Sequence, residues 1–394
     1  MIPMVNRRNL LKGAAAGAIA VPAAGLLATR AFGGTDTAVA PPSAAATLPV
    51  HIVNNTGEWA NSSVYLYVVG NVDGRQVRLT PDGALAPISL DDNGPDGFTD
   101  YAIPLAGSGT TTLHLPYMSG RIYTALGAKL KFKAVADGNG APALAYPAGW
   151  VPTDPNYDVL HDCAEFTYNA DGMFCNVTMV DMFSVPLDVR LQGTADQTAG
   201  VLKPGGRQQI FTEVGRNDTY APLVIGDRRV LAPSHGLDAG LFPSGYFDAY
   251  IDRIWGEGHQ LNVRTNEGYF TGRGSGGRLV FNGPAEVAFD RPTTRDVLFC
   301  DGALHAPNDG MRGPVAAILG AALNRTTAHS HIEQPVTDAA AFYQGDVTHH
   351  YAKALHAAME DGRAYGFAFD DVADFASYIQ DHAPQQFTLT LSPF

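Results

Sequence analysis

Cysteine is scarce in this chain, which excludes one common way of stabilising a secreted fold. Only three cysteines occur among 394 residues, namely Cys163, Cys175 and Cys300. A small and odd number leaves room for one bridge at most, so a disulfide-dense scaffold is excluded. No pair of them has the spacing of zinc ligands. A hydrophobic core must therefore hold the fold together, and the chain is long enough to build one.

Positive charge is also in short supply. Lys and Arg number 26 against 39 Asp and Glu, which gives a formal net charge of −13 at pH 7. Nucleic acids and anionic membranes select basic surfaces, so neither is an expected partner. A neutral polymer such as a glycan is compatible with this charge. Charged residues make up only 16% of the chain and apolar residues 45%, which indicates a globular protein.

An uninterrupted apolar run of membrane-spanning length is missing near the N-terminus. Arg7 and Arg8 precede a mild stretch rich in Ala and Gly, and Pro22 interrupts that stretch. The pattern is typical of a twin-arginine export signal rather than of a membrane anchor, which needs ~20 apolar residues. We therefore expect residues 1–46 to be a signal peptide with a low-complexity linker. We expect the mature protein to be secreted, unattached to a membrane, and monomeric.

Two familiar kinds of reactive site find no match in the sequence. The Gly-rich segment 272–278 has the wrong spacing for a G-x-S-x-G nucleophile elbow, so a serine hydrolase is not expected. The histidine pairs His329/His331 and His349/His350 have no accompanying set of carboxylates or cysteines. We therefore expect no metal site, and the chemistry developed below requires no cofactor.

Short period-two segments are abundant from about residue 48 to 205. Gly, Pro, Asn and Asp separate them, and the chain has 43 Gly and 26 Pro in all. Many short strands with frequent turn residues predict a β-sandwich or barrel over residues 47–205. Residues 385–394 return to period two, so we expect them to form a strand of the same β domain.

Helical periodicity appears between residues 206 and 384. It predicts helices within 206–216, 245–255, 313–325 and 346–362, the last with Asp346 as its N-cap. Short strands are expected between them, including 297–300 and 364–369, and a further helix is expected within 370–379. The chain is thus predicted to be mainly β, with a mixed α/β domain at 206–384 inserted between two parts of the β domain.

One β-rich stretch, "EFTYNADGMFCNVTMVD", begins at Glu165 and ends at Asp181. If residues 170–174 form the loop of a hairpin, Asn169 pairs with Cys175, and Glu165 lies opposite Met179. The two carboxylates then share a face roughly 8–9 Å apart. A slip of one residue would send Asp181 to the opposite face, and the sequence alone leaves the register open. The same register separates Cys175 from Cys163 too widely for a bridge.

A separation of this size suits one kind of chemistry. Inverting glycoside hydrolases hold their two carboxyl groups roughly 6.5–9.5 Å apart, whereas retaining enzymes need ~5 Å. One carboxyl group protonates the departing oxygen, and the other activates a water molecule. Two hydrated surface acids on a hairpin are the alternative interpretation, and this stretch alone does not decide between the two.

The chain resembles the laminaripentaose-producing β-1,3-glucanases of glycoside hydrolase family 64, and the resemblance extends over about residues 48–394. Each matching segment is short, and their order along the chain makes the resemblance specific. The segments are "VYLYVVG", "AEFTYN", "NVTMVD", "GYFDAYIDRIW", "VFNGP", "CDGAL", "QPVTDAAAFY", "YAKALH", "AYGFAFDDV" and "TLTLSPF". The resemblance implies a thaumatin-like β domain joined to a mixed α/β domain, with a wide groove between them.

The resemblance also implies an activity and its catalytic residues. The activity is endo-hydrolysis of linear β-1,3-glucan to short oligosaccharides, with laminaripentaose as the product and inversion at the anomeric carbon. The family's catalytic pair is a Glu in an E-F-T-x-N strand and an Asp sixteen residues later. Here these positions are Glu165, assigned as the general acid, and Asp181, assigned as the general base.

Further residues are candidates for binding the sugar. Thr167 and Asn169 match groove residues of the family, and Phe174 stands where the family has a Trp, so it is the expected aromatic platform. Asp370 and Asp371 are candidates from the α/β side of the groove, with a helix N-cap as the alternative.

A non-catalytic β-glucan-binding protein with a thaumatin-like fold is the alternative function. A groove lined with acids and aromatic rings can bind sugar without cleaving it. Retention of both carboxylates, Glu165 and Asp181, favours the enzyme. Incubation with a linear β-1,3-glucan discriminates between the two functions.

Overall fold

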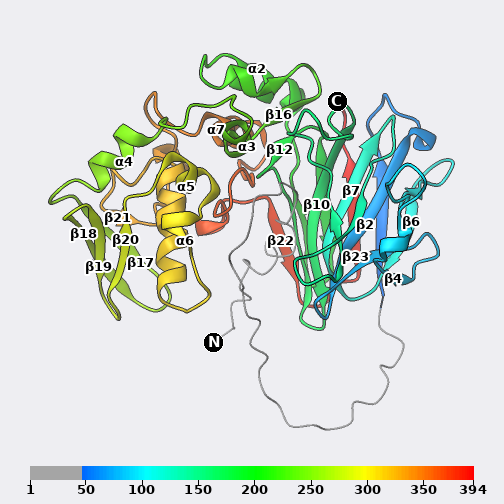
Figure 1. The fold of residues 1–394 in the computed structure, drawn as a ribbon, viewed down its shortest axis with the longest axis horizontal. Helices are drawn as coiled ribbons and strands as arrows, with labels where there is room; N and C mark the ends of the chain where they lie inside the picture. Colours follow the sequence, from blue (N-terminus) through cyan, green and yellow to red (C-terminus); the bar gives the residue numbers. More distant parts are fainter. Residues whose placement is uncertain (1–46) are drawn as a thin grey trace, which may run out of the picture.

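Strands dominate the first half of the chain, and α-helices appear only after residue 205 in the part that the computed structural model describes, residues 47–394. The expected export signal, residues 1–46, lies outside the described residues. Figure 1 shows two packed sheets on one side of the molecule and a smaller sheet with helices on the other. Within residues 47–394, no helix is both long and apolar enough to cross a membrane.

The first sheet has five strands and joins the two ends of the described chain. Its strand order is β14-β13-β23-β1-β6. The last strand pairs in parallel with the first, with Val50 opposite Phe387, so the C-terminal segment returns to the β-rich part as predicted. The strands are β1 (Leu48–Asn54), β6 (Thr111–Leu115), β13 (Leu187–Gln192), β14 (Asp196–Ala199) and β23 (Gln386–Leu391).

The second sheet has eight strands and carries the candidate site. Its order is β22-β11-β10-β7-β2-β3-β4, with β5 paired to β2. Alternate residues such as Ile122 and Phe166 share a hydrophobic core with Val50 and Leu389 of the first sheet. The strands are β2 (Val64–Val72), β3 (Arg75–Leu79), β4 (Leu85–Pro87), β5 (Ile103–Pro104), β7 (Met118–Leu126), β10 (Leu160–Asn169), β11 (Gly172–Val177) and β22 (Tyr378–Asp381).

The other face of the eight-stranded sheet is covered at one end only by a small second core. Tyr67, Tyr123 and Cys163 of this face pack with Phe132 and Leu144, which come from the segment around a two-stranded hairpin. The hairpin consists of β8 (Lys133–Ala136) and β9 (Pro142–Ala145). Beyond this core the same face carries the polar residues described below.

Helices and two further sheets make up residues 206–377, and one of these sheets also includes a short strand at residues 182–183. Helices lie at the predicted segments around 206, 248, 312 and 350, with Pro314 in the first turn of the third, where proline is tolerated. The helices are α2 (Gly206–Gly215), α3 (Pro233–Asp238), α4 (Asp248–Ile254), α5 (Thr294–Phe299), α6 (Arg312–Asn324) and α7 (His350–Ala358). Figure 1 places α4, α5 and α6 beside the outer sheet, and α2, α3 and α7 nearer the β-sandwich.

The strands of this part are short. One sheet has the order β20-β19-β18-β17-β21, and the other has the order β12-β16-β15. They comprise β12 (Met182–Phe183), β15 (Val224–Ile225), β16 (Arg229–Leu231), β17 (Gln260–Arg264), β18 (Tyr269–Ser275), β19 (Arg278–Asn282), β20 (Val287–Asp290) and β21 (Glu333–Gln334). The 3-10 turns are η1 (Asn61–Ser63), η2 (Leu90–Asp92), η3 (Ala221–Leu223), η4 (Gly302–Leu304), η5 (Ala339–Ala341) and η6 (Val372–Asp374).

Several predicted elements are wrong in this part. Residues 297–300 end the helix α5, whose Thr293 and Asp296 form a capping box, so the apolar run there is not a strand. Residues 364–369 form no strand either. The helix expected within 370–379 is absent, because Ala373 and Asp374 have positive φ, and the segment instead forms η6 and then β22. The chain thus rejoins the eight-stranded sheet at Tyr378, earlier than the predicted residue 385.

Helix α7 begins later than predicted. The Nδ1 atom of His349 accepts a hydrogen bond from the backbone N–H of Ala352 (3.1 Å), so His349, and not Asp346, is the N-cap. Its buried residues follow helical spacing, as Tyr351, Leu355 and Ala358 show. This face of α7 contributes one of the side chains that position the candidate base.

Candidate active site

The β10–β11 hairpin is tighter than predicted. Asn169 pairs with Gly172, so the turn has two residues, and Glu165 lies opposite Asn176 rather than Met179. The Oδ1 atom of Asn169 accepts the backbone N–H of Asp171 (2.9 Å), and Gly172 adopts a φ of 129°. The predicted register is therefore wrong by three residues, which reverses the face of every side chain on β11.

The corrected register places a row of polar side chains across four adjacent strands. Arg121 of β7, Glu165 of β10, Asn176 of β11 and Tyr378 of β22 lie directly opposite one another, and so on one face. Glu165 is only 1% exposed. Its Oε1 atom accepts hydrogen bonds from Nε (3.0 Å) and Nη2 (2.8 Å) of Arg121, and its Oε2 atom accepts one from Nδ2 of Asn176 (3.3 Å).

Asp181 reaches this face from a loop instead of a strand. Strand β11 ends at Val177, and residues 178–181 lead to β12. The carbonyl oxygen of Asp181 accepts the N–H of Ala232 (3.0 Å). Its carboxylate is 30% exposed, with Oδ1 2.8 Å from Nε2 of His235 and Oδ2 3.8 Å from Nη1 of Arg121. A single guanidinium thus contacts both predicted catalytic carboxylates, which limits how far apart they can lie.

The surroundings of Asp181 favour its charged form. Burial raises the pKa of this carboxyl group, but the hydrogen bond and charge of His235, together with the charge of Arg121, outweigh burial. The pKa of Asp181 therefore lies below its ordinary value, as suits a group that must accept a proton.

His235 is itself held by aromatic rings. It belongs to α3, and its ring stacks on that of Trp150 with centroids 4.0 Å apart and an interplanar angle of 19°. Phe299 meets it edge-on, with centroids 5.8 Å apart. The loop that carries Trp150 is fixed by Arg229, whose guanidinium donates to the carbonyl oxygens of Gly149 and Val159 (2.6 Å each).

Three buried polar atoms near the carboxylates have no hydrogen-bond partner among residues 47–394. They are Oδ1 of Asn176, Oγ1 of Thr178 and Nδ1 of His235. Buried polar atoms in native proteins are nearly always paired, so these three have hydrogen-bonding capacity that the described residues leave unused. The predicted binding residues Thr167 and Asn169 lie on the same face, both partly exposed, with Thr167 Oγ1 2.9 Å from Ser119 Oγ.

Phe174 cannot serve as the predicted aromatic platform in this structure. It lies in β11 rather than in the loop, is 0% exposed, and contacts the ring of His382 with centroids 5.8 Å apart. With no ring face open to a sugar, Phe174 is a core residue. The partly exposed Trp150 beside Asp181 is an aromatic residue that the sequence reasoning missed.

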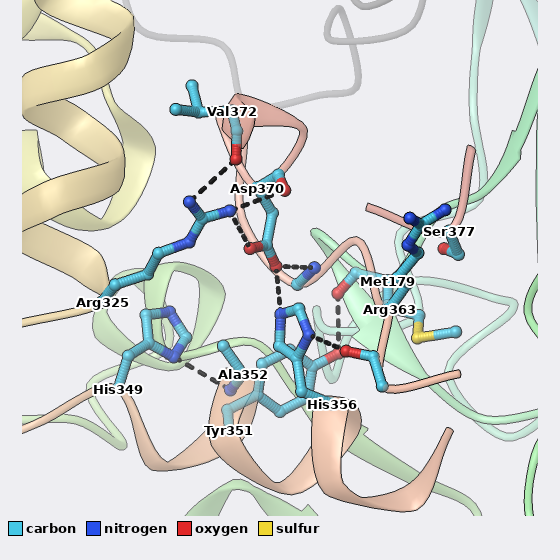
Figure 2. Close-up of polar contacts among 12 residues, drawn as sticks. Met179, Arg325, His349, Tyr351, Ala352, His356, Arg363, Asp370, Val372 and Ser377 are labelled. Atoms are coloured by element: carbon cyan, nitrogen blue, oxygen red, sulfur yellow. Dashed lines mark hydrogen bonds and ion pairs between the residues drawn. The ribbon is translucent and has the colours of Figure 1, made fainter. Parts of the chain in front are cut away.

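Asp370 is not a groove residue either. It is fully buried, with Oδ1 accepting from Arg325 (3.1 Å) and Oδ2 accepting from His356 (3.0 Å) and from the N–H of Gly366 (3.0 Å). Figure 2 shows these contacts converging on the Asp370 carboxylate. Asp371 is partly exposed and precedes the short turn η6 without a side-chain capping hydrogen bond, so the alternative prediction, a helix N-cap, is not met either.

The buried Asp370 cluster adjoins the loop that carries Asp181. The N–H of Met179 donates to the carbonyl oxygen of Tyr365 (2.9 Å), next to the Gly366 held by Asp370. The hydroxyl of Tyr351 donates to the carbonyl oxygen of Met179 (2.7 Å), a contact visible in Figure 2. The backbone two residues before the candidate base is therefore anchored to both α7 and the segment before η6.

The cysteines and the possible metal ligands were also considered in the sequence. Cys163, Cys175 and Cys300 are all buried free thiols. Cys175 lies opposite Phe166 in the corrected register, three residues along β10 from Cys163 and on the opposite face of the sheet. The two thiols are therefore still too far apart for a bridge, as predicted, although the register used to predict it is wrong. Among the described residues no group of three or more His, Cys, Asp or Glu side chains could hold a metal ion.

Comparison with known proteins places this chain among the glycoside hydrolases. A family model described as β-1,3-glucanase, Glyco_hydro_64, matches residues 46–391. The chain therefore belongs to glycoside hydrolase family 64, the β-1,3-glucanases. Glucan endo-1,3-beta-glucosidases of Cellulosimicrobium cellulans and of Arthrobacter sp. (strain YCWD3) are each 35% identical over 392 residues, covering 93% of this chain and 69% of theirs.

Solved structures agree with the family. A laminaripentaose-producing β-1,3-glucanase in complex with laminaritetraose is 36% identical, with a TM-score of 0.81 over 88% of this chain and 99% of that chain. A β-1,3-glucanase domain from Clostridium beijerinckii has the same fold at 24% identity, with a TM-score of 0.77 over 90% of this chain and 100% of that one.

Proposed function

We propose that this chain is a secreted, endo-acting β-1,3-glucanase that cuts linear β-1,3-glucan by inversion and releases short oligosaccharides, mainly laminaripentaose. The observation that carries the proposal is the placement of Glu165 and Asp181 around one guanidinium group, that of Arg121. Family membership and the substrates named for the relatives support the substrate class. We assign Glu165 as the general acid and Asp181 as the general base.

The proposed reaction is a single displacement. Oδ2 of Asp181, the oxygen not bonded to His235, takes a proton from a water molecule, which attacks the anomeric carbon. Glu165 gives its proton to the departing glycosidic oxygen on the other side of the sugar ring. Arg121, at 2.8 Å and 3.0 Å from Oε1, is placed to stabilise the negative charge that then appears on Glu165.

Sugar hydroxyl groups would find partners along the same face of the sheet. Thr167 and Asn169 lie two and four residues beyond Glu165 on β10, and Thr178 contributes a buried, unpaired hydroxyl. We further propose that the glucan lies in a wide groove between a thaumatin-like β domain and the mixed α/β domain. In support, Asp181 follows a β-sandwich strand, and its partner His235 comes from α3.

Replacement of the general acid tests the assignment. Glu165→Gln keeps the shape of the side chain but has no acidic proton to donate, so hydrolysis of linear β-1,3-glucan should fall at least about 100-fold. Glu213→Gln is the matched control, because Glu213 also pairs with an arginine, Arg216, but on the exposed surface of α2. Full activity in Glu165→Gln would overturn the assignment.

The anomer formed first tests the mechanism. Proton NMR during the first minutes of hydrolysis, before mutarotation, should show α-anomeric reducing ends if the attack is a single displacement. A β-anomer formed first would mean a retaining mechanism. Binding of the glucan without any turnover by the unaltered protein would support the alternative, a non-catalytic glucan-binding protein.

A further inference from the structure

The contact between His235 and Asp181 does more than lower the pKa of this carboxyl group, because it also fixes one of the two carboxylate oxygens. Nε2 of His235 lies 2.8 Å from Oδ1 of Asp181, and the imidazole side chain is only 13% exposed. The other ring nitrogen, Nδ1, is buried without a hydrogen-bond partner among the described residues. His235 is therefore committed to a single polar contact, and that contact is with the candidate base.

Three surrounding elements fix the ring in this position. Trp150 stacks against one face of the imidazole, Phe299 of α5 meets it edge-on, and the backbone of α3 carries it. The backbone of the partner is fixed as well, since the Asp181 carbonyl oxygen accepts the N–H of Ala232, one residue before α3 begins. Both ends of the contact are thus held before any substrate binds, which is the preorganisation that a catalytic carboxylate needs.

We propose that His235 is a positioning residue for the general base: it occupies Oδ1 of Asp181, turns Oδ2 toward the attacking water, and keeps the carboxylate ionised in acidic solution. The proposal rests on the role of Asp181 in the function proposed above. The bond to a donor favours the charged carboxylate, and the direction of the pKa of Asp181, below its ordinary value, agrees with this.

Other charged and titratable groups also face this pair, and their contributions are separable. Arg121 acts on Asp181 in the same direction as His235, so removal of His235 alone should leave part of the effect. Arg295 and Asp238 pair with each other at 3.5 Å on α5 and α3. The groups near the pair on β7, β10, α3, α5 and α7 are Arg121, Cys163, Glu165, Asp238, Arg295 and Tyr351.

The pH profile of kcat/KM on a soluble β-1,3-gluco-oligosaccharide tests the proposal. In His235→Ala, the acidic limb should move to higher pH by about one unit, the contribution of one charge-assisted hydrogen bond. The activity loss should therefore be about tenfold in acidic solution and smaller near neutral pH. His235→Gln retains an N–H donor without a charge, so its rate near neutral pH should recover while its acidic limb stays shifted.

The chain offers a matched control in His305. His305 pairs with Asp301 at 3.1 Å on the surface, so His305→Ala removes a similar contact away from the site and should leave the profile unchanged. An acidic limb that stays in place in both His235 variants would overturn the proposal.

A second measurement does not depend on turnover. The carboxyl carbon of Asp181 can be followed by NMR in aspartate-labelled protein carrying Glu165→Gln, with Asp181→Asn identifying the signal. Its titration midpoint should rise when His235→Gln is added, and an unchanged midpoint would overturn the proposal. If the unaltered protein cleaves no glucan, the proposed function fails, while this titration still decides the role of His235.

Discussion

Two clusters in this molecule combine the same side-chain types in different environments. In each, one aspartate contacts one arginine and one histidine. The carboxylate of Asp181 is 30% exposed, whereas that of Asp370 is 0% exposed. The partners are Arg121 and His235 for Asp181, and Arg325 and His356 for Asp370.

The two carboxylates differ in the hydrogen bonds that their oxygens already accept. Both oxygens of Asp370 accept hydrogen bonds at 3.0–3.1 Å, from Arg325, His356 and the N–H of Gly366. Figure 2 shows Arg325 and His356 on either side of this carboxylate. Within residues 47–394, the charged group that contacts Oδ2 of Asp181 is Arg121, at 3.8 Å. A buried carboxylate that accepts hydrogen bonds on both oxygens supports the backbone around it, whereas one with an open oxygen can exchange a proton. Residue type alone therefore does not mark the reactive aspartate.

Replacement of Asp181, the partly exposed carboxylate, should have the largest effect on activity. Asp181→Asn leaves no group to take the proton of the attacking water, so kcat should fall about 100- to 10,000-fold. The free energy of unfolding should change little. Initial rates on linear β-1,3-glucan, with denaturant unfolding of the same samples, provide the check. Strong loss of stability would mean that Asp181 has a structural role like that of Asp370.

Replacement of Asp370, whose two oxygens both accept hydrogen bonds, should have the reverse effect: a loss of stability with little loss of activity. Asp370→Asn leaves the buried guanidinium of Arg325 without its counter-charge, so the free energy of unfolding should fall by about 3–5 kcal/mol. The folded fraction should keep its kcat within a few-fold. Asp301→Asn is the control, because its pair with His305 is exposed and worth little. Unchanged stability in Asp370→Asn would contradict the comparison.

The buried cluster should also respond to pH. Burial lowers the pKa of His356, but the charge and hydrogen bond of Asp370 outweigh burial and hold this pKa above its ordinary value. Protonated His356 therefore stabilises the fold, fully below the unfolded pKa of about 6.5, and this contribution is lost as pH rises through the folded pKa.

The measurement is the difference in unfolding free energy between the unaltered protein and His356→Ala. We expect this difference to be larger at about pH 6 than at about pH 9. His305→Ala, which removes an exposed histidine, should show no such trend. A difference that is constant with pH would show that His356 contributes packing and not charge.

Local signals in the sequence were enough for some of the fold. Apolar spacing, with Pro314 near the start of α6, located α2, α4, α6 and α7 but missed α3 and α5, and period two located the terminal strand β23. The order of family segments selected Glu165 and Asp181. The register failed because a hairpin with a longer loop fits the same alternation, and only the bond from Asp171 to Asn169 distinguishes the tight turn.

Long-range contacts account for what the sequence did not reveal. Arg121 is 44 residues from Glu165, and His235 is 54 residues from Asp181, so no motif could connect either pair. Asp370 was predicted as a groove residue or a helix N-cap because it stands beside Asp371 and before a segment of helical pattern. Its buried partner Arg325 lies 45 residues earlier in the chain.

The smallest expected effects come from variants in two matched pairs of hydroxyl groups, one on the partly open face and one in the interior. Thr167 and Ser119 lie 2.9 Å apart on the partly open face, and Thr348 and Thr326 lie 2.9 Å apart in the interior. Thr167→Val should raise KM a few-fold with little change in stability, because its hydroxyl is on the side available to sugar. Thr348→Val should lower the unfolding free energy by about 1 kcal/mol and leave KM unchanged, since it removes one internal hydrogen bond. If both variants changed only stability, the face around Thr167 would be scaffold, and the sugar would have to bind elsewhere along the sheet.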